Sequence, residues 1–389
     1  MPKTAGIYIH IPFCERKCTY CNFNTTDFDS PLSADYVQAV LAEIVHTGER
    51  LSLDSHKLAA DTIFFGGGTP SIITAEQIRS LICACNDSFN IAADSEVTIE
   101  INPGTLEPGK LRDWKSAGIN RASVGVQSFR DDELVKLSRT HSASQARATV
   151  AALRNAGFNN ISLDLIAGLP EQSLEDWRLN LDEALRIRPE HLSLYLLEIK
   201  EGTQLFAQIK RNQRARPDDD LAGDMYTMIC EAAGEAGYEQ YEISNFALRT
   251  VEPSESPFRS KHNLKYWTGA PFYGMGCGAH SYNGRSRWVN IAKTENYIEA
   301  VMTTGRGIAE QHDLSNEDNA AEALFMGLRL NEGISLDAFS ADYGVSVIET
   351  YGPELERLSE SGLVEIEPGR LKLTHRGRLL SNEVFVTFV

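Results

Sequence analysis

The sequence has few of the features that would place it in a membrane, outside the cell or on a nucleic acid. No stretch reaches the roughly 18 consecutive apolar residues that a membrane-spanning helix needs. Seven cysteines without a charged and then apolar leader favour reduced thiols in the cytoplasm over a disulfide framework. Positive charge is also scarce, since 37 Lys and Arg stand against 54 Asp and Glu and give a formal net charge of −17. Because such a chain would repel a polyphosphate, nucleic acid is not expected as a partner.

What is present suits a large α/β domain followed by a small one. The chain has 389 residues, 42% of them apolar, and no long low-complexity tract, so we expect it to fold nearly throughout. Strand-like runs alternate with helical stretches, which is typical of consecutive βαβ units with a parallel sheet. Six such runs occur, at residues 6–11, 62–65, 96–101, 121–126, 161–166 and 191–197. Six units favour a partial (β/α)6 barrel, in which ligands lie at the carboxyl ends of the strands.

Three cysteines, Cys14, Cys18 and Cys21, lie in one short loop after the first predicted strand, spaced C-x3-C-x2-C. A four-iron cluster held by three cysteines leaves one iron without a protein ligand, and a small chelating molecule can occupy that position. A zinc site is the alternative. Zinc usually takes four tetrahedral ligands, however, and a fourth candidate such as His10 lies on or beside the strand. The spacing therefore favours a loop that presents an iron–sulfur cofactor.

This spacing resembles that of the radical S-adenosylmethionine (radical SAM) superfamily. The resemblance implies a [4Fe-4S] cluster on the three cysteines, with the amino and carboxylate groups of S-adenosylmethionine on the fourth iron. It also implies an electron donor for the cluster, because in that family an electron from the reduced cluster breaks a C–S bond of S-adenosylmethionine and gives a 5′-deoxyadenosyl radical.

The second predicted strand ends in a run of glycines, Phe65-Gly-Gly-Gly-Thr-Pro70. Consecutive glycines let the backbone approach a ligand closely and expose N–H and C=O groups to it. A lone glycine run is more often only a turn. Placed after a strand and downstream of the cysteine loop, however, this run resembles the Gly-Gly-Gly-Thr-Pro element of the radical SAM family, and the resemblance implies contact with the amino group of S-adenosylmethionine.

Charged and amide side chains lie in or just after the later strands, at Glu100, Gln127, Arg139 and Asp164. Buried charges are costly unless something pairs with them. The charged residues could neutralise one another as a structural network. They could equally hold the amine, the carboxylate and the ribose hydroxyls of S-adenosylmethionine, and the fixed fork of donors on Arg139 suits the carboxylate.

Over most of its length the chain is similar to the oxygen-independent coproporphyrinogen III oxidase family. The resemblance implies cofactor-binding roles for Tyr8, Gly67, Gly68, Thr69, Glu100, Gln127, Arg139 and Asp164. Two departures weigh against oxidase activity. The oxidases carry a further cysteine two residues after the third, where this chain has Phe23. They also carry an extension before the first strand, whereas in this chain we expect the first strand to begin by about residue 6. Phe23 is kept among the cofactor-binding candidates.

A later motif, His262-Asn-Leu-Lys-Tyr-Trp267, fits the pattern H-N-x-x-Y-W. It resembles the HemW branch of that family, the heme chaperones, which implies heme and an acceptor hemoprotein as partners. Imidazole is a common axial ligand of heme iron, phenolate is another, and aromatic rings cover a flat macrocycle. His262, Tyr266 and Trp267 are therefore heme-contact candidates. The alternative is a hydrogen-bonded packing cluster.

We expect the chain to divide into a barrel at 1–245, a less regular connector at 246–312, and a C-terminal unit at 313–389. The connector carries the H-N-x-x-Y-W motif and a glycine-rich segment with Cys277. We expect Cys277 to fill a buried space, and the alternative is an incidental heme ligand or thioether site. Helices and a Pro-Gly hairpin in the last unit resemble a winged helix, yet its acidic wing suits a lid or partner surface. Two function classes result, a heme chaperone and a porphyrinogen-decarboxylating enzyme. A homodimer and peripheral membrane contact stay open.

Overall fold

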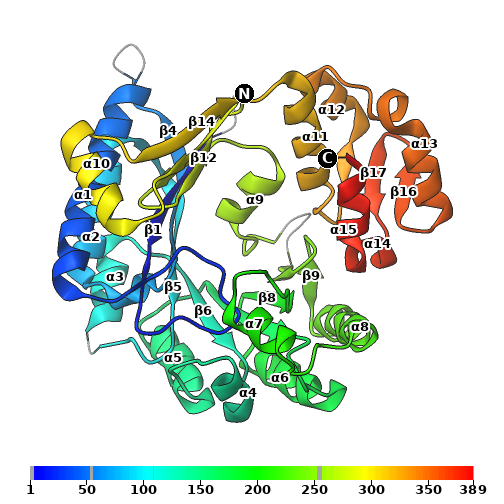
Figure 1. Ribbon diagram of the computed structural model, residues 1–389, viewed down its shortest axis with the longest axis horizontal. Helices are drawn as coiled ribbons and strands as arrows, with labels where there is room; N and C mark the ends of the chain where they lie inside the picture. Colours follow the sequence, from blue (N-terminus) through cyan, green and yellow to red (C-terminus); the bar gives the residue numbers. More distant parts are fainter. Residues whose placement is uncertain (1–3, 53–55, 108, 252–255, 389) are drawn as a thin grey trace.

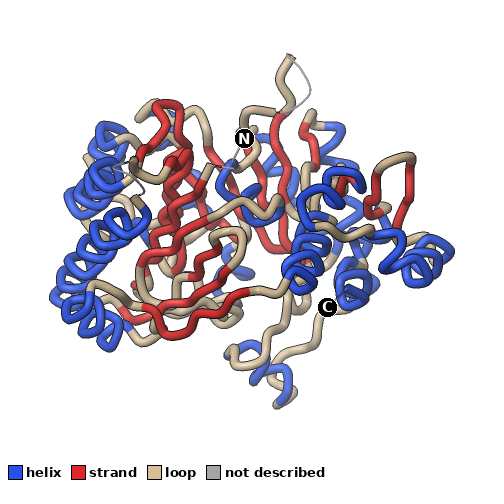
Figure 2. The backbone as a smooth tube through the Cα atoms, turned by 90° about the horizontal axis from the view of Figure 1, so that it is seen from above, coloured by secondary structure: helices blue, strands red, loops and turns tan. Residues whose placement is uncertain are grey.

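The computed structural model describes residues 4–52, 56–107, 109–251 and 256–388. It has an α/β fold with a 12-stranded, mostly parallel sheet, helices on the outer face of this sheet, and a smaller C-terminal unit (Figure 1). The predicted fold class is confirmed. Figure 2 shows the strands in the middle of the molecule with helices on either side.

The six predicted strands form the parallel centre of the sheet, each hydrogen-bonded to the next. They are β1 (Ala5–Ile11), β4 (Ala59–Gly67), β5 (Asn90–Ile101), β6 (Arg121–Gln127), β7 (Ile161–Ala167) and β8 (His191–Leu196). The carboxyl ends of all six therefore lie at one end of the barrel, next to the short strands β2 (Phe13–Cys14) and β3 (Thr26–Asp27).

Further strands extend both edges of this centre. Beyond β8 the sheet continues antiparallel through β10 (Asn245–Leu248) and β9 (Tyr238–Gln240). On the other side β11 (Phe272–Met275) pairs in parallel with β1, and β12 (His280–Tyr282), β13 (Ser286–Asn290) and β14 (Ile308–Asp313) follow antiparallel. Residues 246–312, expected to be a less regular connector, thus contribute strands to the main sheet, because each one completes hydrogen bonds that an edge strand would leave open.

Strand alternation gives the barrel an apolar outside and a polar inside. On β5, the apolar Val97 and Ile99 lie on the outer face, whereas the polar Thr98 and Glu100 lie on the inner face. The outer face packs against α1 (Ser30–Leu51), α2 (Ala75–Ser88), α3 (Lys110–Ala117), α5 (Ala143–Asn155), α6 (Leu174–Ile187), α8 (Asp219–Glu235) and α10 (Thr294–Thr304). The short helix α4 (Asp131–Lys136) follows β6. Capping boxes at Thr74, Ser142 and Ser173 begin three of these helices.

Helix α9 (Lys261–Trp267) fills the inside of the barrel near the amino ends of the strands (Figure 1). Nδ1 of His262 lies 2.7 Å from the hydroxyl of Thr62 on β4, and Nζ of Lys265 donates to the carbonyl of Thr4 at 2.8 Å. The H-N-x-x-Y-W motif is therefore at the opposite end of the barrel from the cysteine loop.

The C-terminal unit has its own apolar core, which includes Leu324, Phe339, Leu355 and Leu371. Its elements are α11 (Asn316–Gly327), β15 (Ile334–Ser335), α12 (Leu336–Tyr343), α13 (Val347–Glu360), β16 (Val364–Glu367), β17 (Arg370–Leu373), α14 (His375–Leu379) and α15 (Ser381–Phe385). Helices thus precede a hairpin, as expected. The divisions at 245 and 312 stay predictions.

Helix α11 and the residues after it join the two sides of the open barrel. Near its start, Asn319 accepts a hydrogen bond of 2.6 Å from the hydroxyl of Tyr282 on β12. Beyond its end, Nη2 of Arg329 lies 3.5 Å from the buried carboxylate of Glu242, which follows β9. The C-terminal unit thereby closes the gap that a six-unit barrel leaves. Within the described part of the chain, no helix is both long and apolar enough to cross a bilayer.

Candidate cofactor site

The cysteine loop is closed at its base by a small parallel ladder between β2 and β3. Phe13 pairs with Thr26, and Cys14 pairs with Asp27, so the loop leaves and returns at the same place. Farther along the loop, the N–H of Thr19 donates to the carbonyl of Leu137, and the carbonyl of Thr19 accepts from Leu205 at the start of α7 (Gln204–Lys210). The backbone of the loop is thus held at its base and at its middle.

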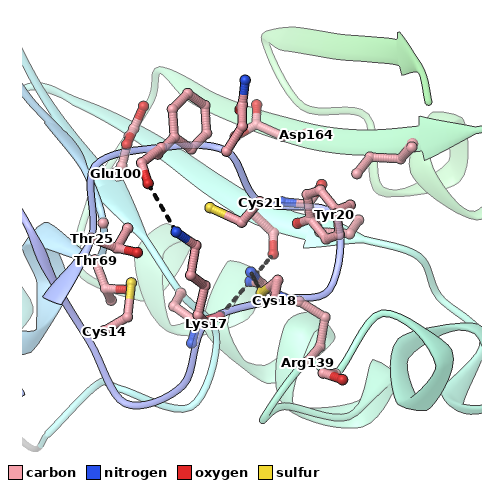
Figure 3. Close-up of a pocket in the computed structure, with 18 of the residues that line it drawn as sticks. Cys14, Lys17, Cys18, Tyr20, Cys21, Thr25, Thr69, Glu100, Arg139 and Asp164 are labelled. Carbon is pink, nitrogen blue, oxygen red and sulfur yellow. Dashed lines mark hydrogen bonds between the residues drawn. The ribbon is translucent and has the colours of Figure 1, made fainter. Parts of the chain in front are cut away.

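A cavity of about 470 Å³ opens where this loop faces the carboxyl ends of the strands. The three cysteines line it together with most of the predicted cofactor-binding residues: Phe23, Gly67, Gly68, Thr69, Glu100, Gln127, Arg139 and Asp164. Figure 3 shows the cysteines, Arg139, Glu100 and Asp164 around this space. The structure therefore brings together residues from the ends of β4, β5, β6 and β7, from the cysteine loop, from the glycine run after β4 and from the loop after α4.

Burial controls the chemistry of the thiols. It raises the pKa of Cys14 to about 11, although the hydroxyl of Thr69, 3.4 Å from its sulfur, acts in the other direction. Burial likewise raises the pKa of Cys21. Because metal ligation requires thiolates, loading of this site releases protons. Within the described residues, no group of three or more His, Cys, Asp or Glu side chains is arranged to hold a single metal ion.

The glycine run packs tightly against the base of the loop. A Cβ on Gly68 would lie 2.6 Å from the carbonyl oxygen of Pro12, and Gly67 has a φ of +112° and packs on the ring of His10. Nε2 of His10 donates to the carbonyl of Asn24 at 2.9 Å, which leaves Nδ1 to accept from the hydroxyl of Tyr8 at 3.1 Å. His10 thus links the glycine run to the cysteine loop.

Tyr8 lies one layer below the cavity rather than in its wall. Its ring approaches Gly66, where a Cβ would come within 3.0 Å, and stacks on the ring of Phe64 at 6.2 Å between centroids. Burial, followed by the nearby carboxyl group of Glu100, raises the pKa of Tyr8 well above its ordinary value. The phenol therefore stays protonated and supports the layer above it.

Arg139 is fixed by three acceptors at the cavity wall. Nη2 donates to Oδ1 of Asn102 at 2.5 Å and to the carbonyl of Gly125 at 2.8 Å, and Nη1 lies 3.5 Å from the sulfur of Cys18. Its buried Nε has no hydrogen-bond partner among the residues that the structure describes. An unpaired buried donor costs about 1–3 kcal/mol, so the guanidinium has unused capacity for an anionic ligand.

Two carboxyl groups face the cavity from neighbouring parts of the sheet. Burial, followed by the charge of Asp164, raises the pKa of Glu100 to about 8, against the effect of a hydrogen bond from the N–H of Gly67 at 3.1 Å. Burial also raises the pKa of Asp164, which accepts from the hydroxyl of Ser123 at 3.1 Å. A ligand with a positive charge would stabilise the ionised form of both groups.

Gln127 occupies a strained position at the end of β6. Its φ is +63°, which is uncommon for a residue other than glycine, and the pairing of β6 with β7 shifts between Val124 and Gln127. A left-handed conformation of this kind costs about 1–2 kcal/mol, and such strain is concentrated at functional sites. Gln127 lines the cavity from this bulge.

The three heme-contact candidates lie apart from this cavity. His262 is buried, and its Nε2 is 3.0 Å from the hydroxyl of Tyr266, so both ring nitrogens have partners. The ring of Trp267 lies 4.3 Å from the guanidinium of Arg329 in the C-terminal unit. These contacts describe a packing cluster between the barrel and that unit.

Cys277 is buried, and its sulfur and carbonyl both lie near the side-chain amide of Asn24, at 3.4 and 3.2 Å. Asn24 also donates to the carbonyl of Ala292 at 2.8 Å. The glycine-rich segment around Cys277 is therefore hydrogen-bonded to the end of the cysteine loop. Sequence reasoning did not single out Asn24 or Asn102. The signal for Asn102 was its place two residues after Glu100, which puts both side chains on the same face of the strand end.

The residues present fit an iron–sulfur cluster with S-adenosylmethionine. Three thiols, two cavity-facing carboxyl groups, a glycine cradle and an arginine with an unpaired buried donor surround one space. In chemical type, the thiols suit the irons of the cluster, and the carboxyl groups suit the ammonium group of S-adenosylmethionine. The glycines allow close approach of the backbone to S-adenosylmethionine, and the arginine suits its carboxylate.

Comparison with known proteins points the same way. The Radical SAM superfamily matches residues 8–184, and the HemN C-terminal domain matches residues 314–380. The chain is 37% identical to the heme chaperone HemW of Bacillus subtilis, with 98% of each chain covered. It is 32% identical to the protein of that name in Lactococcus lactis, over 100% of this chain and 98% of the other.

Among solved structures, coproporphyrinogen III oxidase (HemN) from Escherichia coli, described as a radical SAM enzyme, covers 100% of this chain and 90% of its own length. The TM-score is 0.83 and the sequence identity 23%, so this likeness concerns the fold. Given a relative 37% identical across almost the whole chain, the protein belongs to the family of the heme chaperone HemW within the radical SAM superfamily.

Proposed function

We propose that this protein is a heme chaperone that binds heme and hands it to an acceptor hemoprotein. It carries a [4Fe-4S] cluster on Cys14, Cys18 and Cys21, with S-adenosylmethionine on the open iron. The observation that carries the proposal is the similarity, over nearly the full length, to proteins named heme chaperone HemW, combined with three cysteines on one cavity.

The cavity residues divide the work of holding S-adenosylmethionine. Arg139 pairs with its carboxylate through the guanidinium, Glu100 takes its ammonium group beside Gly67, and Asp164 accepts from the ribose hydroxyls. When S-adenosylmethionine is bound, an electron from the reduced cluster would break its C–S bond. A separate donor must deliver that electron to the cluster.

The alternative is oxidative decarboxylation of coproporphyrinogen III. The similarity to HemN concerns the fold and does not favour this activity. The position of the oxidases' further cysteine is held by Phe23, whose side chain cannot ligate iron and is 60% exposed. We therefore place the chaperone first. A cytoplasmic location is part of this proposal.

The test separates the two functions in one preparation. The protein is reconstituted anaerobically with iron and sulfide, supplied with S-adenosylmethionine, and divided between a heme titration and an assay with coproporphyrinogen III. Saturable one-to-one heme binding without formation of the vinyl product supports the chaperone. Turnover of coproporphyrinogen III without saturable heme binding would refute it and favour the oxidase.

A further inference from the structure

In this structure the histidine of the H-N-x-x-Y-W motif is not free to bind heme iron. Both ring nitrogens of His262 are engaged, one by Thr62 and the other by Tyr266. Ligation of iron by this imidazole would break one buried hydrogen bond and open the stack that His262 forms with Phe64, at 5.1 Å between centroids. Such a change leaves buried polar groups unsatisfied, at about 1–3 kcal/mol each. The motif does not offer a prepared heme site.

The mouth of the large cavity offers one. Phe23 is 60% exposed and Tyr195 is 40% exposed, and both line the cavity together with Leu197. Large aromatic side chains exposed at the rim of a cavity need an explanation, because water surrounds apolar surface that folding would normally bury. The flat apolar face of a porphyrin would cover this surface.

Positive charge lies beside these aromatic residues, although the chain as a whole is strongly acidic. Lys17 and Lys200 line the cavity and are exposed. Nζ of Lys200 lies 2.6 Å from the carboxylate of Glu198, and the side chains of both residues are more than half exposed. An exposed pair of this kind is worth about 0–1 kcal/mol, so a carboxylate ligand can replace Glu198 at small cost. Figure 3 shows Lys17 reaching across the cysteine loop, and its Nζ lies 3.4 Å from the carbonyl of Phe23.

We infer that heme binds at the mouth of the cysteine cavity, with its face on Phe23, Tyr195 and Leu197 and its propionates toward Lys17 and Lys200. The inference rests on the proposed function and names its ligand site. S-adenosylmethionine takes the inner part of the cavity, where Glu100, Arg139 and Asp164 lie, and heme takes the outer part.

This site holds heme without a histidine. No histidine is found among the cavity-lining residues in the described part of the chain, and the three thiols belong to the cluster. The porphyrin is therefore held by its face and its carboxylates. Because no strong axial bond to iron has to break, such a site suits a protein that must release heme to an acceptor.

The experiment is a hemin titration of the full chain, reconstituted anaerobically, followed by the heme absorbance band. Lys200→Glu and Phe23→Asp are expected to raise the Kd about 10-fold each. The matched controls are Lys57→Glu, at an exposed lysine near the amino end of β4, and Met302→Asp, at a side chain 61% exposed on α10. His262→Ala and the milder Tyr266→Phe are expected to keep the Kd within about 2-fold.

The outcomes separate the site from the function. No saturable binding by the unmodified protein would refute the proposed function itself. Saturable binding that Lys200→Glu and Phe23→Asp leave unchanged would overturn the site while the function stands. If His262→Ala fails to fold, Tyr266→Phe and the two cavity variants still decide, since each changes an exposed side chain or a single hydroxyl.

Discussion

His10 and Asn24 are joined by a hydrogen bond of 2.9 Å from the imidazole Nε2 to the backbone carbonyl, at the end of the cysteine loop. The side chain of Asn24 continues this link to Cys277 and Ala292, more than 250 residues away in the sequence. The loop that carries the cysteines is thus fixed by the first strand and by the glycine-rich segment after β11. Cluster retention should depend on this connection.

Replacing Asn24 by alanine should make the reconstituted cluster less stable. The variant loses three side-chain contacts, to the carbonyl and sulfur of Cys277 and to the carbonyl of Ala292, so the loop moves more freely. We expect iron to be lost to a chelator about 3–10 times faster, measured by the decay of the visible absorbance, with a thermal unfolding midpoint within a few degrees of the parent.

Asn22→Ala is the matched control, since Asn22 is an exposed asparagine of the same loop. It should lose iron at the parental rate. Equal rates of iron loss for Asn24→Ala and the parent would show that the connection does not hold the cluster loop.

Glu100 should destabilise the cofactor-free protein as the pH rises. The folded-state pKa of about 8 is above the ordinary value of 4.5, so between these values the folded state binds a proton that the unfolded state has lost. The free energy of unfolding therefore falls as the pH increases through this window, by up to about 1.4 kcal/mol per unit. Glu100→Gln removes this contribution.

Urea denaturation at pH 5 and pH 8 measures the effect. The advantage of Glu100→Gln over the parent should be larger at pH 8, by about 1–3 kcal/mol, while the affinity of the reconstituted variant for S-adenosylmethionine falls. An advantage that is the same at both pH values would contradict a raised pKa at Glu100.

His262 should act in the opposite pH range. Burial, then the positive charges of Lys265 and Arg121, lowers its pKa to about 3. Below about pH 6.5 the unfolded state gains a proton that the folded state does not, so stability falls as the pH drops toward 4. In His262→Gln the free energy of unfolding should decrease less steeply with falling pH, and Tyr266→Phe should cost about 1 kcal/mol at neutral pH. Identical slopes for the parent and His262→Gln would contradict a buried neutral imidazole.

Arg139→Lys should weaken the binding of S-adenosylmethionine. A lysine keeps the positive charge but lacks the guanidinium, whose Nη2 contacts Asn102 and Gly125 and whose Nε has no partner among the described residues. Calorimetric titration of the reconstituted protein should show at least a 10-fold higher Kd, with iron content near the parental value. An unchanged Kd would remove Arg139 from the binding site.

Much of this architecture could be predicted from the sequence because its signals are local. The six central strands are short apolar or alternating runs, and the glycine run and cysteine spacing lie within single loops. The edge strands of residues 246–312 could not be foreseen, because β11 becomes a strand by pairing with β1, a partner about 265 residues away in the chain. Tertiary pairing of this kind overrides weak local preference.

The roles of single polar side chains were harder to foresee for the same reason. The sequence around Asn24 does not predict a hydrogen bond to Cys277, and the sequence around His262 does not predict one to Thr62. The aromatic and imidazole side chains of the H-N-x-x-Y-W motif suit both heme contact and packing. Their hydrogen bonds in the folded chain describe the packing.

Transfer of heme from this protein to another can be measured directly. Heme-loaded protein, with its cluster intact, is mixed with an excess of an apo-form b-type hemoprotein, and the absorbance band of the acceptor is followed over time. If this protein is a heme chaperone, the acceptor gains stoichiometric heme while this chain returns to its heme-free spectrum. Heme that stays on this chain for hours against the excess of acceptor would contradict a chaperone.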